Sequence, residues 1–184
     1  MIRKITAPLD ENVIRSLNAG DEILLSGIIF TGRDAAHKRL CSLIDKGDSL
    51  PVDLNGAVIY FVGPAPSKPG KVIGSAGPTT SYRMDSYSPL LIEKAALKGM
   101  IGKGQRSEKV KDSMKKHCAV YFAAIGGAGA LMSKCIVKSE IVAYEDLGPE
   151  AIRRLEVVDM PLIVATDCYG NDLYETGPAG YSKE

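Results

Sequence analysis

The sequence VIGSAGPTTSYRMD, residues 72–85, places an apolar run, a Gly-Pro break and a group of hydroxyl side chains in direct succession. Gly77-Pro78 ends a strand and allows the backbone to turn, so the pattern predicts a strand over 71–76 that leads toward a helix. Three hydroxyl side chains follow the break, Thr79, Thr80 and Ser81. Such residues are favoured as helix N-caps, and together with the nearby Arg83 they would also suit a carboxylate or phosphate at a helix N-terminus. The stretch is therefore expected either merely to cap a helix or to hold an anion.

Short apolar runs alternate with polar, helix-like segments along the rest of the chain. Strands are expected over residues 1–9, 22–30, 57–62, 71–76, 100–101, 119–124, 135–144 and 157–165. Helices are expected over 10–17, 33–45, 86–98, 107–118 and 149–155, with a further short helix after the small-residue turn at 126–130. The alternation predicts an α/β fold with one central sheet system, whereas a regular doubly wound sheet fits the irregular spacing poorly. A single domain is expected over 1–176, followed by a loose tail over 177–184.

The composition is that of an ordinary globular protein. The chain has 184 residues, of which 45% are hydrophobic and 24% charged, and its formal net charge is +1. This balance gives no general reason to expect nucleic acid or a membrane surface as a partner. No apolar run approaches the roughly 18 to 20 residues that span a bilayer, and residues 1–5 lack the apolar core of a secretory leader. A cytoplasmic location is therefore expected.

The cysteine pattern gives no sign of a metal site in this chain. Four cysteines occur, Cys41, Cys118, Cys135 and Cys168. None stands at C-x-x-C spacing, and neither His37 nor His117 forms a zinc pattern with them. Each lies in or beside an apolar segment, where cysteine often acts as a small buried hydrophobe. No metal or cluster is expected on ligands from this chain.

Three turns share one pattern, in which an apolar run ends at a glycine and a cation follows. These turns are Gly32-Arg33, the segment from Gly77 to Arg83, and Gly102-Lys103-Gly104. In α/β proteins, such strand ends are where functional groups are displayed. Arginine suits bidentate binding of a carboxylate and lysine supplies a compact charge, so a shared ligand with two negative charges, such as a dicarboxylate, is indicated. The alternative is three unrelated surface salt bridges.

Five segments of the sequence resemble those of a known family. The segments are GRDAAHKR at 32–39, AGPTTSYRM at 76–84, GKGQRS at 102–107, KKHCAVYFAAIGGAGAL at 115–131 and AYEDLGPEAIRRLEVVDMPLIVATDCYGNDLY at 143–174. In this order they resemble the iron–sulfur hydro-lyases of the class I fumarase and L-tartrate dehydratase group. The similarity is to the C-terminal domain of these enzymes, or to the separate β subunit where there are two subunits, and it covers nearly the whole chain.

The resemblance implies a fold, a reaction and a partner. The fold would be the swivelling β/β/α domain, and the reaction would be reversible addition of water to fumarate, giving L-malate. A four-iron–four-sulfur cluster would be held by three cysteines of a partner α subunit, which agrees with the absence of such a pattern among this chain's cysteines. The assembly would be an α2β2-type heteromer or a homodimer of this subunit.

The matching motifs also imply catalytic residues. Thr79 matches the threonine proposed as the catalytic base, and Arg83 matches the arginine that holds the substrate and supports that threonine. If both lie on one helix, their i,i+4 spacing puts them on the same face, and if the chain is not yet helical at Thr79, only proximity remains. His37 matches a histidine to which an acid/base role is sometimes assigned, with the alternative that it only orients Arg33 or Asp34 or caps a neighbouring loop.

The remaining expected site residues bind the substrate. They are Arg33, Lys103, Thr80 and Ser81. We expect the β subunit of a class I fumarate hydratase, with an L-tartrate dehydratase subunit as the first alternative. A subunit that binds an anion or serves as a scaffold, without a catalytic residue of its own, is the second.

Overall fold

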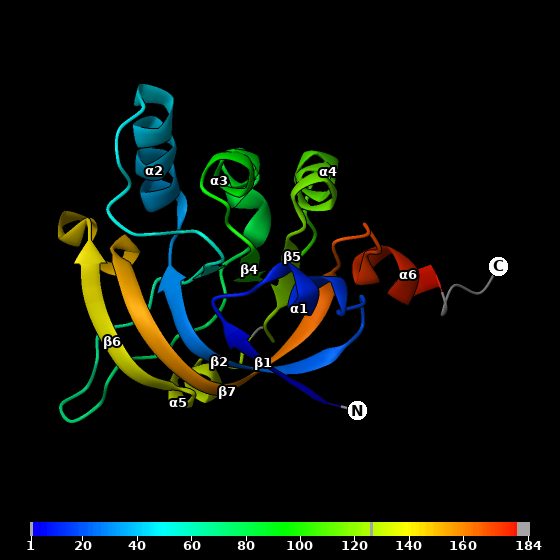
Figure 1. Ribbon diagram of the computed structural model, residues 1–184. Helices are drawn as coiled ribbons and strands as arrows, with labels where there is room; N and C mark the ends of the chain where they lie inside the picture. The colour runs from blue at the N-terminus through cyan, green and yellow to red at the C-terminus, as the bar shows by residue number, and fades with distance from the viewer. Residues whose placement is uncertain (1, 126, 180–184) are drawn as a thin grey trace.

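A sheet that closes on itself organises the molecule (Figure 1). The structure is a computed structural model that describes residues 2–125 and 127–179. Within these residues the strand order is β1-β2-β3-β4-β5-β7-β6, and an additional pairing joins β2 to β7. The strands are β1 (Arg3–Ala7), β2 (Glu22–Thr31), β3 (Val58–Tyr60), β4 (Gly99–Gly102), β5 (Val120–Ala123), β6 (Ile136–Ala143) and β7 (Ile152–Thr166). The β2–β7 pairing closes β2, β3, β4, β5 and β7 into a barrel.

The helices connect and cover this barrel. They are α1 (Glu11–Arg15), α2 (Asp34–Lys46), α3 (Ser88–Lys94), α4 (Glu108–His117), α5 (Gly129–Lys134) and α6 (Leu173–Ala179), with the 3₁₀ helices η1 (Ser81–Met84) and η2 (Glu145–Glu150). Figure 1 shows α2, α3 and α4 side by side above one end of the strands. The expected α/β class is confirmed, in the form of a mixed sheet that closes.

The long strand β7 makes the closure possible. It runs antiparallel to β2, β5 and β6, so different parts of one strand complete three ladders. A bulge interrupts the β2–β7 register next to Gly27, whose φ is 105°. A Cβ at Gly27 would lie 2.3 Å from the carbonyl oxygen of Ala7, so only glycine lets β1 approach β2 this closely.

Two hydrophobic clusters follow from the alternation of side chains along the strands. Tyr60 and Phe122 belong to the cluster shared by β1, β2, β3, β5 and β7. Phe61 and Tyr121, their neighbours in sequence, belong to the cluster beneath α2, α3 and α4. Successive strand residues point to opposite faces, so the same short strands supply both layers.

Most of the elements expected from the sequence are present. The expected segments 1–9, 22–30, 57–62, 100–101, 119–124, 135–144 and 157–165 all contain strands, and 10–17, 33–45, 86–98 and 107–118 all contain helices. The short helix expected after the turn at 126–130 is α5, although Gly126 lies outside the described residues. The helix expected over 86–98 is shorter, because α3 covers only Ser88–Lys94.

Two expectations are wrong. Residues 71–76 form no strand, because this run lies against the loop around Pro64 and Pro66, whose prolines have no amide to extend a ladder. A Cβ at Gly74 would lie 2.2 Å from the carbonyl oxygen of Ala65, which shows how closely the two segments approach. Residues 152–155, expected to be helical, are instead the start of β7, where pairing with β6 and β2 satisfies both edges of the strand.

The last described residues of the chain form α6 (Leu173–Ala179). Residues 177–179 of the expected tail are therefore helical, and residues 180–184 lie outside the described part of the chain. No helix within the described residues has the length and apolar character needed to cross a membrane.

Candidate functional site

The three glycine–cation turns meet at one edge of the barrel. Strands β2, β3, β4 and β5 are parallel neighbours, so their carboxyl ends lie at the same edge. Arg33 follows β2 and Lys103 follows β4. The segment at Thr79 lies between the ends of β3 and β4, because Thr79 N donates to the carbonyl oxygen of Phe61 at 2.7 Å and Lys103 N donates to that of Thr79 at 3.3 Å. The turns are therefore neighbours in space.

Thr79 precedes the helix rather than starting it. The 3₁₀ helix η1 begins at Ser81, and Thr80 before it has extended backbone angles of φ −62° and ψ 121° without a side-chain capping bond. The prediction that the hydroxyls cap a helix is wrong. Backbone pairing with Lys103 holds Thr80 extended instead. The i,i+4 argument for Thr79 and Arg83 therefore fails, and only their proximity in sequence remains.

The Ser81 hydroxyl turns inward. Ser81 is buried, and its hydroxyl lies 2.8 Å from that of Tyr121 in a hydrogen bond. A Cβ at Gly102 would lie 1.9 Å from Ser81 Oγ, so the glycine makes room for this side chain. The structure thus brings Ser81 to the site through its backbone, while its hydroxyl is engaged in the core.

Arg33 and Arg83 share one carboxylate. Arg83 Nε donates to Asp34 Oδ1 at 3.0 Å, and Arg33 Nε lies 4.0 Å from Asp34 Oδ2. Arg33 also lies 3.4 Å from Glu150, through Nη2 and Oε1. Arg33 Nε and Asp34 Oδ2 are buried without a hydrogen-bond partner among the described residues. The two cations are thus parts of one cluster built around the Asp34 carboxylate.

Glu150 and Gly63 were missed by the sequence analysis. Glu150 accepts from the backbone N–H of Ala35 at 3.0 Å besides pairing with Arg33, so it fixes the start of α2. A Cβ at Gly63 would lie 2.9 Å from Arg33 Nη1, because the arginine side chain lies directly over this glycine. No spacing in the sequence links either residue to Arg33.

Lys103 is a cation of the site that is both exposed and without an ion pair among the described residues. Its side chain is at the surface and forms no ion pair with any residue that the structure describes. The backbone on both sides is fixed, since Lys103 O also accepts from Ser81 N at 2.9 Å. A fixed backbone with an available ammonium is suited to an anionic ligand.

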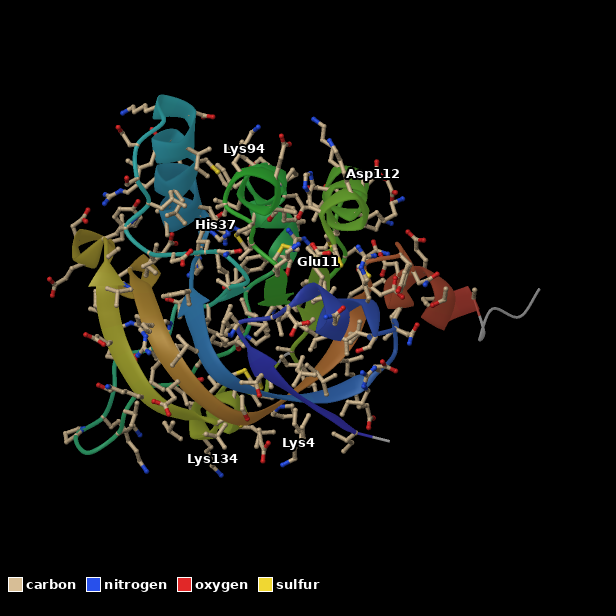
Figure 2. All side chains as sticks on the ribbon, in the orientation of Figure 1. Lys4, Glu11, His37, Lys94, Asp112 and Lys134 are labelled. Carbon is tan, nitrogen blue, oxygen red and sulfur yellow. The ribbon has the colours of Figure 1, made fainter. Side chains whose placement is uncertain are left out.

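His37 lies in the first turn of α2 (Figure 2), four residues after Arg33, the residue that precedes the helix. Its side chain is fully buried, and Nδ1–H donates to the carbonyl oxygen of Arg33 at 2.9 Å. Burial lowers the pKa of His37 to about 4, so the ring is neutral at neutral pH. Phe61 packs edge-on against the ring at a centroid distance of 5.3 Å, and Nε2 has no partner among the described residues. This geometry fits a residue that orients the backbone of Arg33.

Arg106 is buried next to the same edge of the barrel, where it contacts Phe61 and Tyr121. Its guanidinium is buried, donates from Nε to Asp85 Oδ1 at 2.7 Å and from Nη2 to Ser88 at 2.7 Å, and lies over the rings of Phe61 and Tyr121 at 5.2 and 5.1 Å. Arg106 belongs to the GKGQRS motif, but the sequence analysis assigned a role only to Lys103. Its burial shows a structural role in that motif.

The described residues contain no group of three or more His, Cys, Asp or Glu side chains that could hold a metal ion. Cys41, Cys118 and Cys168 are buried and Cys135 is partly buried. Burial raises the pKa of Cys41 and of Cys168 to about 11, so these thiols stay protonated. The residues present do not fit a thiolate-ligated cluster.

Comparison with known proteins identifies the family. The family model described as Fumarase C-terminus matches residues 3–177. The anaerobic class I fumarate hydratase of Escherichia coli K12 is 43% identical over 82% of this chain, and a putative class I fumarate hydratase of Geobacillus stearothermophilus is 39% identical over 93%. The chain spans only 28% and 33% of these two proteins.

A second kind of relative has nearly the same length. A putative L(+)-tartrate dehydratase subunit beta of Methanocaldococcus jannaschii is 36% identical over 91% of this chain and 88% of its own length. The match over almost the entire chain, with the strand-end motifs gathered at one edge of the barrel, shows that the chain belongs to the fumarase C-terminal family.

Proposed function

We propose that the chain is the substrate-binding β subunit of an iron–sulfur hydro-lyase that reversibly hydrates fumarate to L-malate. The observation that carries the proposal is the gathering of Arg33, Arg83 and Lys103 beside Thr79 at one edge of the barrel. Several cations at fixed positions suit a ligand with two carboxylates. The fumarate hydratases among the relatives support the same class of substrate.

The reaction can be followed in the dehydration direction. A base removes a proton from the carbon next to a carboxylate, and hydroxide leaves from the neighbouring carbon as the double bond forms. Negative charge develops on the carboxylate, and the fixed cations stabilise it more in the transition state than in the ground state. We assign carboxylate binding to Arg33 and Lys103, with the Thr80 segment beside them.

Thr79 is our candidate for the base. A hydroxyl is a poor base at neutral pH, so Thr79 needs a nearby cation that favours its alkoxide. We assign this task to Arg83, which also holds the substrate. Arg83 is bound to Asp34 in the structure, so a substrate carboxylate would compete with Asp34 for the guanidinium. For His37, the buried and neutral ring supports positioning of Arg33 over direct acid/base catalysis.

A partner α subunit is proposed to hold the four-iron–four-sulfur cluster. When bound, such a cluster would supply an iron that polarises the carboxylate and hydroxyl of the substrate. The thiols of Cys41 and Cys168, which burial keeps protonated, support a location of the cluster outside this chain. We propose an α2β2-type heteromer, or a homodimer of this subunit, in which this chain acts as a swivelling β/β/α domain. The cytoplasmic location stays a prediction.

Dehydration of L-tartrate is the second candidate function. The relative from Methanocaldococcus jannaschii, which this chain covers over 88% of its length, favours it. Tartrate also carries two carboxylates and a hydroxyl next to a removable proton, so the same residues could serve both reactions. Assays of the reconstituted enzyme with L-malate and with L-tartrate distinguish the two substrates.

The test of the proposal uses the chain reconstituted with its α partner and cluster. Thr79→Ala and Arg83→Met should each lower kcat/KM for fumarate hydration by about 10²-fold or more, because each removes transition-state stabilisation. Arg15→Met is the matched control, since Arg15 is also a surface arginine paired with one carboxylate, Glu11, but lies on α1. A subunit that only serves as a scaffold would keep full turnover in both site variants, and that result would refute the proposal.

A further inference from the structure

The turn at Lys103-Gly104 has its backbone polar groups held on every side. Lys103 N donates to the carbonyl oxygen of Thr79 at 3.3 Å, and Lys103 O accepts from Ser81 N at 2.9 Å. Gly104 has a φ of 82°, a conformation that strains any other residue. The backbone of the turn that carries the exposed Lys103 is thus held in one conformation.

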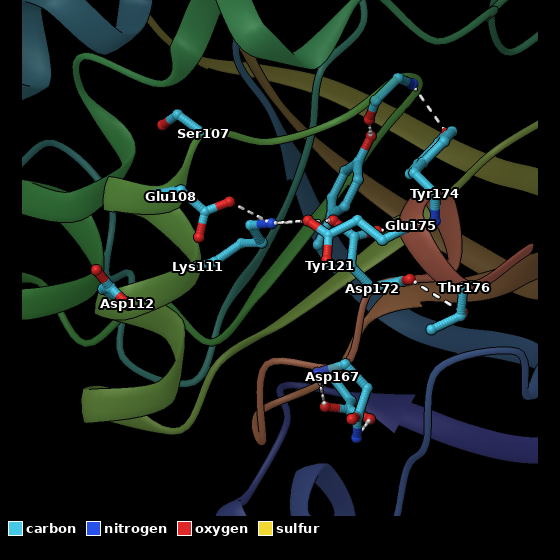
Figure 3. A network of polar contacts seen from close by, with 12 residues as sticks. Ser107, Glu108, Lys111, Asp112, Tyr121, Asp167, Asp172, Tyr174, Glu175 and Thr176 are labelled. Carbon is cyan, nitrogen blue, oxygen red and sulfur yellow. Dashed lines mark hydrogen bonds and ion pairs between the residues drawn. The ribbon is translucent and has the colours of Figure 1, made fainter. Parts of the chain in front are cut away.

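Two tyrosine hydroxyls complete the frame around Gly104 (Figure 3). The Tyr121 hydroxyl donates to the carbonyl oxygen of Gly104 at 2.9 Å, and Gly104 N donates to the Tyr174 hydroxyl at 2.9 Å. Tyr121 belongs to the core strand β5, and its burial raises the pKa of the hydroxyl, which keeps its proton for this bond. Tyr174 comes from α6, the last described helix of the chain. A carboxyl-terminal helix therefore contacts the turn beside the substrate-binding edge.

The position of α6 is fixed without the Tyr174 hydroxyl. Lys111 of α4 is buried, forms an ion pair with Glu175 of α6, and lies 3.6 Å from Asp172 Oδ2 (Figure 3). Asp172 Oδ1 accepts from Tyr174 N at 2.9 Å and so caps the start of the helix. These contacts hold α6 against α4, so the Tyr174 hydroxyl can be removed while the helix stays docked.

We propose that Tyr174 is a positioning residue, which holds the Lys103-Gly104 turn so that the Lys103 ammonium faces the dicarboxylate. The inference rests on the proposed function, since it takes Lys103 as a substrate contact. Lysine has a flexible four-carbon stem, so the position of its charge depends on how firmly its backbone is held. Fixing that backbone improves the orientation of substrate relative to the reacting groups.

The main test is Tyr174→Phe, which removes one hydroxyl and keeps the ring. Hydrogen exchange of the Gly104 amide in the full chain should speed up by about three- to tenfold, the range expected when one neutral hydrogen bond is lost. In the enzyme reconstituted with its α partner, KM for fumarate should rise by about the same factor while kcat changes less than about twofold. Tyr169→Phe is the matched control, because the Tyr169 hydroxyl donates to the carbonyl oxygen of Arg15 at 2.8 Å, away from the turn, and it should change neither quantity.

A double-mutant cycle with Lys103→Met shows whether Tyr174 acts through the lysine. Tyr174→Phe should raise KM no further in the Lys103→Met background, whereas a general structural weakening would add its full effect there. Faster Gly104 exchange with an unchanged KM, or a full additive effect in the double variant, would overturn the positioning role while Lys103→Met alone still supports the proposed function. If Lys103→Met leaves KM unchanged, the substrate contact itself is refuted, and this inference with it.

Discussion

Replacing Gly102 with alanine should lower the free energy of unfolding by about 2–4 kcal/mol. The added Cβ would lie 1.9 Å from Ser81 Oγ and 2.9 Å from Cδ2 of Phe61. Overpacking of a core in this way costs about 1–3 kcal/mol. If Ser81 turns aside to relieve it, the hydrogen bond to Tyr121 is lost, at a further cost of about 1 kcal/mol. Urea unfolding of the full chain, followed by circular dichroism, measures the change.

Two companion variants make this prediction refutable. Gly77→Ala is the control, because its Cβ would lie no closer than 3.6 Å to the nearest atom, and the free energy of unfolding should change by less than about 0.5 kcal/mol. Adding Ser81→Ala to Gly102→Ala removes the closest contact, so the double variant should be more stable than the sum of the single effects predicts. Equal midpoints for Gly102→Ala and Gly77→Ala, or strict additivity with Ser81→Ala, would show that the contact is not what makes Gly102 necessary.

Two further predictions concern titrating groups. As pH falls from 6.5 to 4, the free energy of unfolding should decrease by on the order of 2–3 kcal/mol, because the unfolded state binds a proton that buried His37, with its pKa lowered from 6.5 to about 4, does not. Urea titrations should show a decrease that is larger by this amount in the native chain than in His37→Asn, and an equal decrease in both would contradict it. At pH 8 a thiol reagent should modify the partly buried Cys135 before Cys41, whose pKa is raised to about 11 by burial, and peptide mass spectrometry showing the opposite order would refute this.

The elements that could be predicted from the sequence are those whose own residues indicate the structure, without contacts from distant segments. Strand β2 is a continuous apolar run that ends at Gly32, and α1 begins after Asp10, whose carboxylate accepts from Val13 N. The two wrongly predicted elements are segments whose structure depends on distant parts of the chain. The start of β7, from Ile152, has helix-like spacing on its own, but pairing with β2 and β6 makes it a strand. The run over 71–76 looks like a strand, but its neighbour in space is a proline-rich loop.

The candidate site could likewise be predicted only in part from the sequence. The pattern of a glycine followed by a cation at the end of an apolar run was enough to predict that Arg33 and Lys103 lie at one edge, because parallel strands bring such ends together. The partners of these residues could not be found from the sequence. Glu150 and Tyr174 reach the site from distant segments, and only the folded barrel brings them to Arg33 and Gly104.

The antiparallel pairing of β7 with β2 also has a consequence for how the chain folds. Glu22 pairs with Ile163, so the ladder that closes the barrel joins residues from opposite ends of the domain. Such non-local pairing loses a large amount of chain entropy before its hydrogen bonds and packing contacts stabilise the structure, and it therefore slows folding. Because β7 follows every other strand in the sequence, a growing chain exposes the unpaired edges of β2 and β5 until residues 152–166 have been made. Folding intermediates that lack β7 should therefore be the species most prone to aggregate.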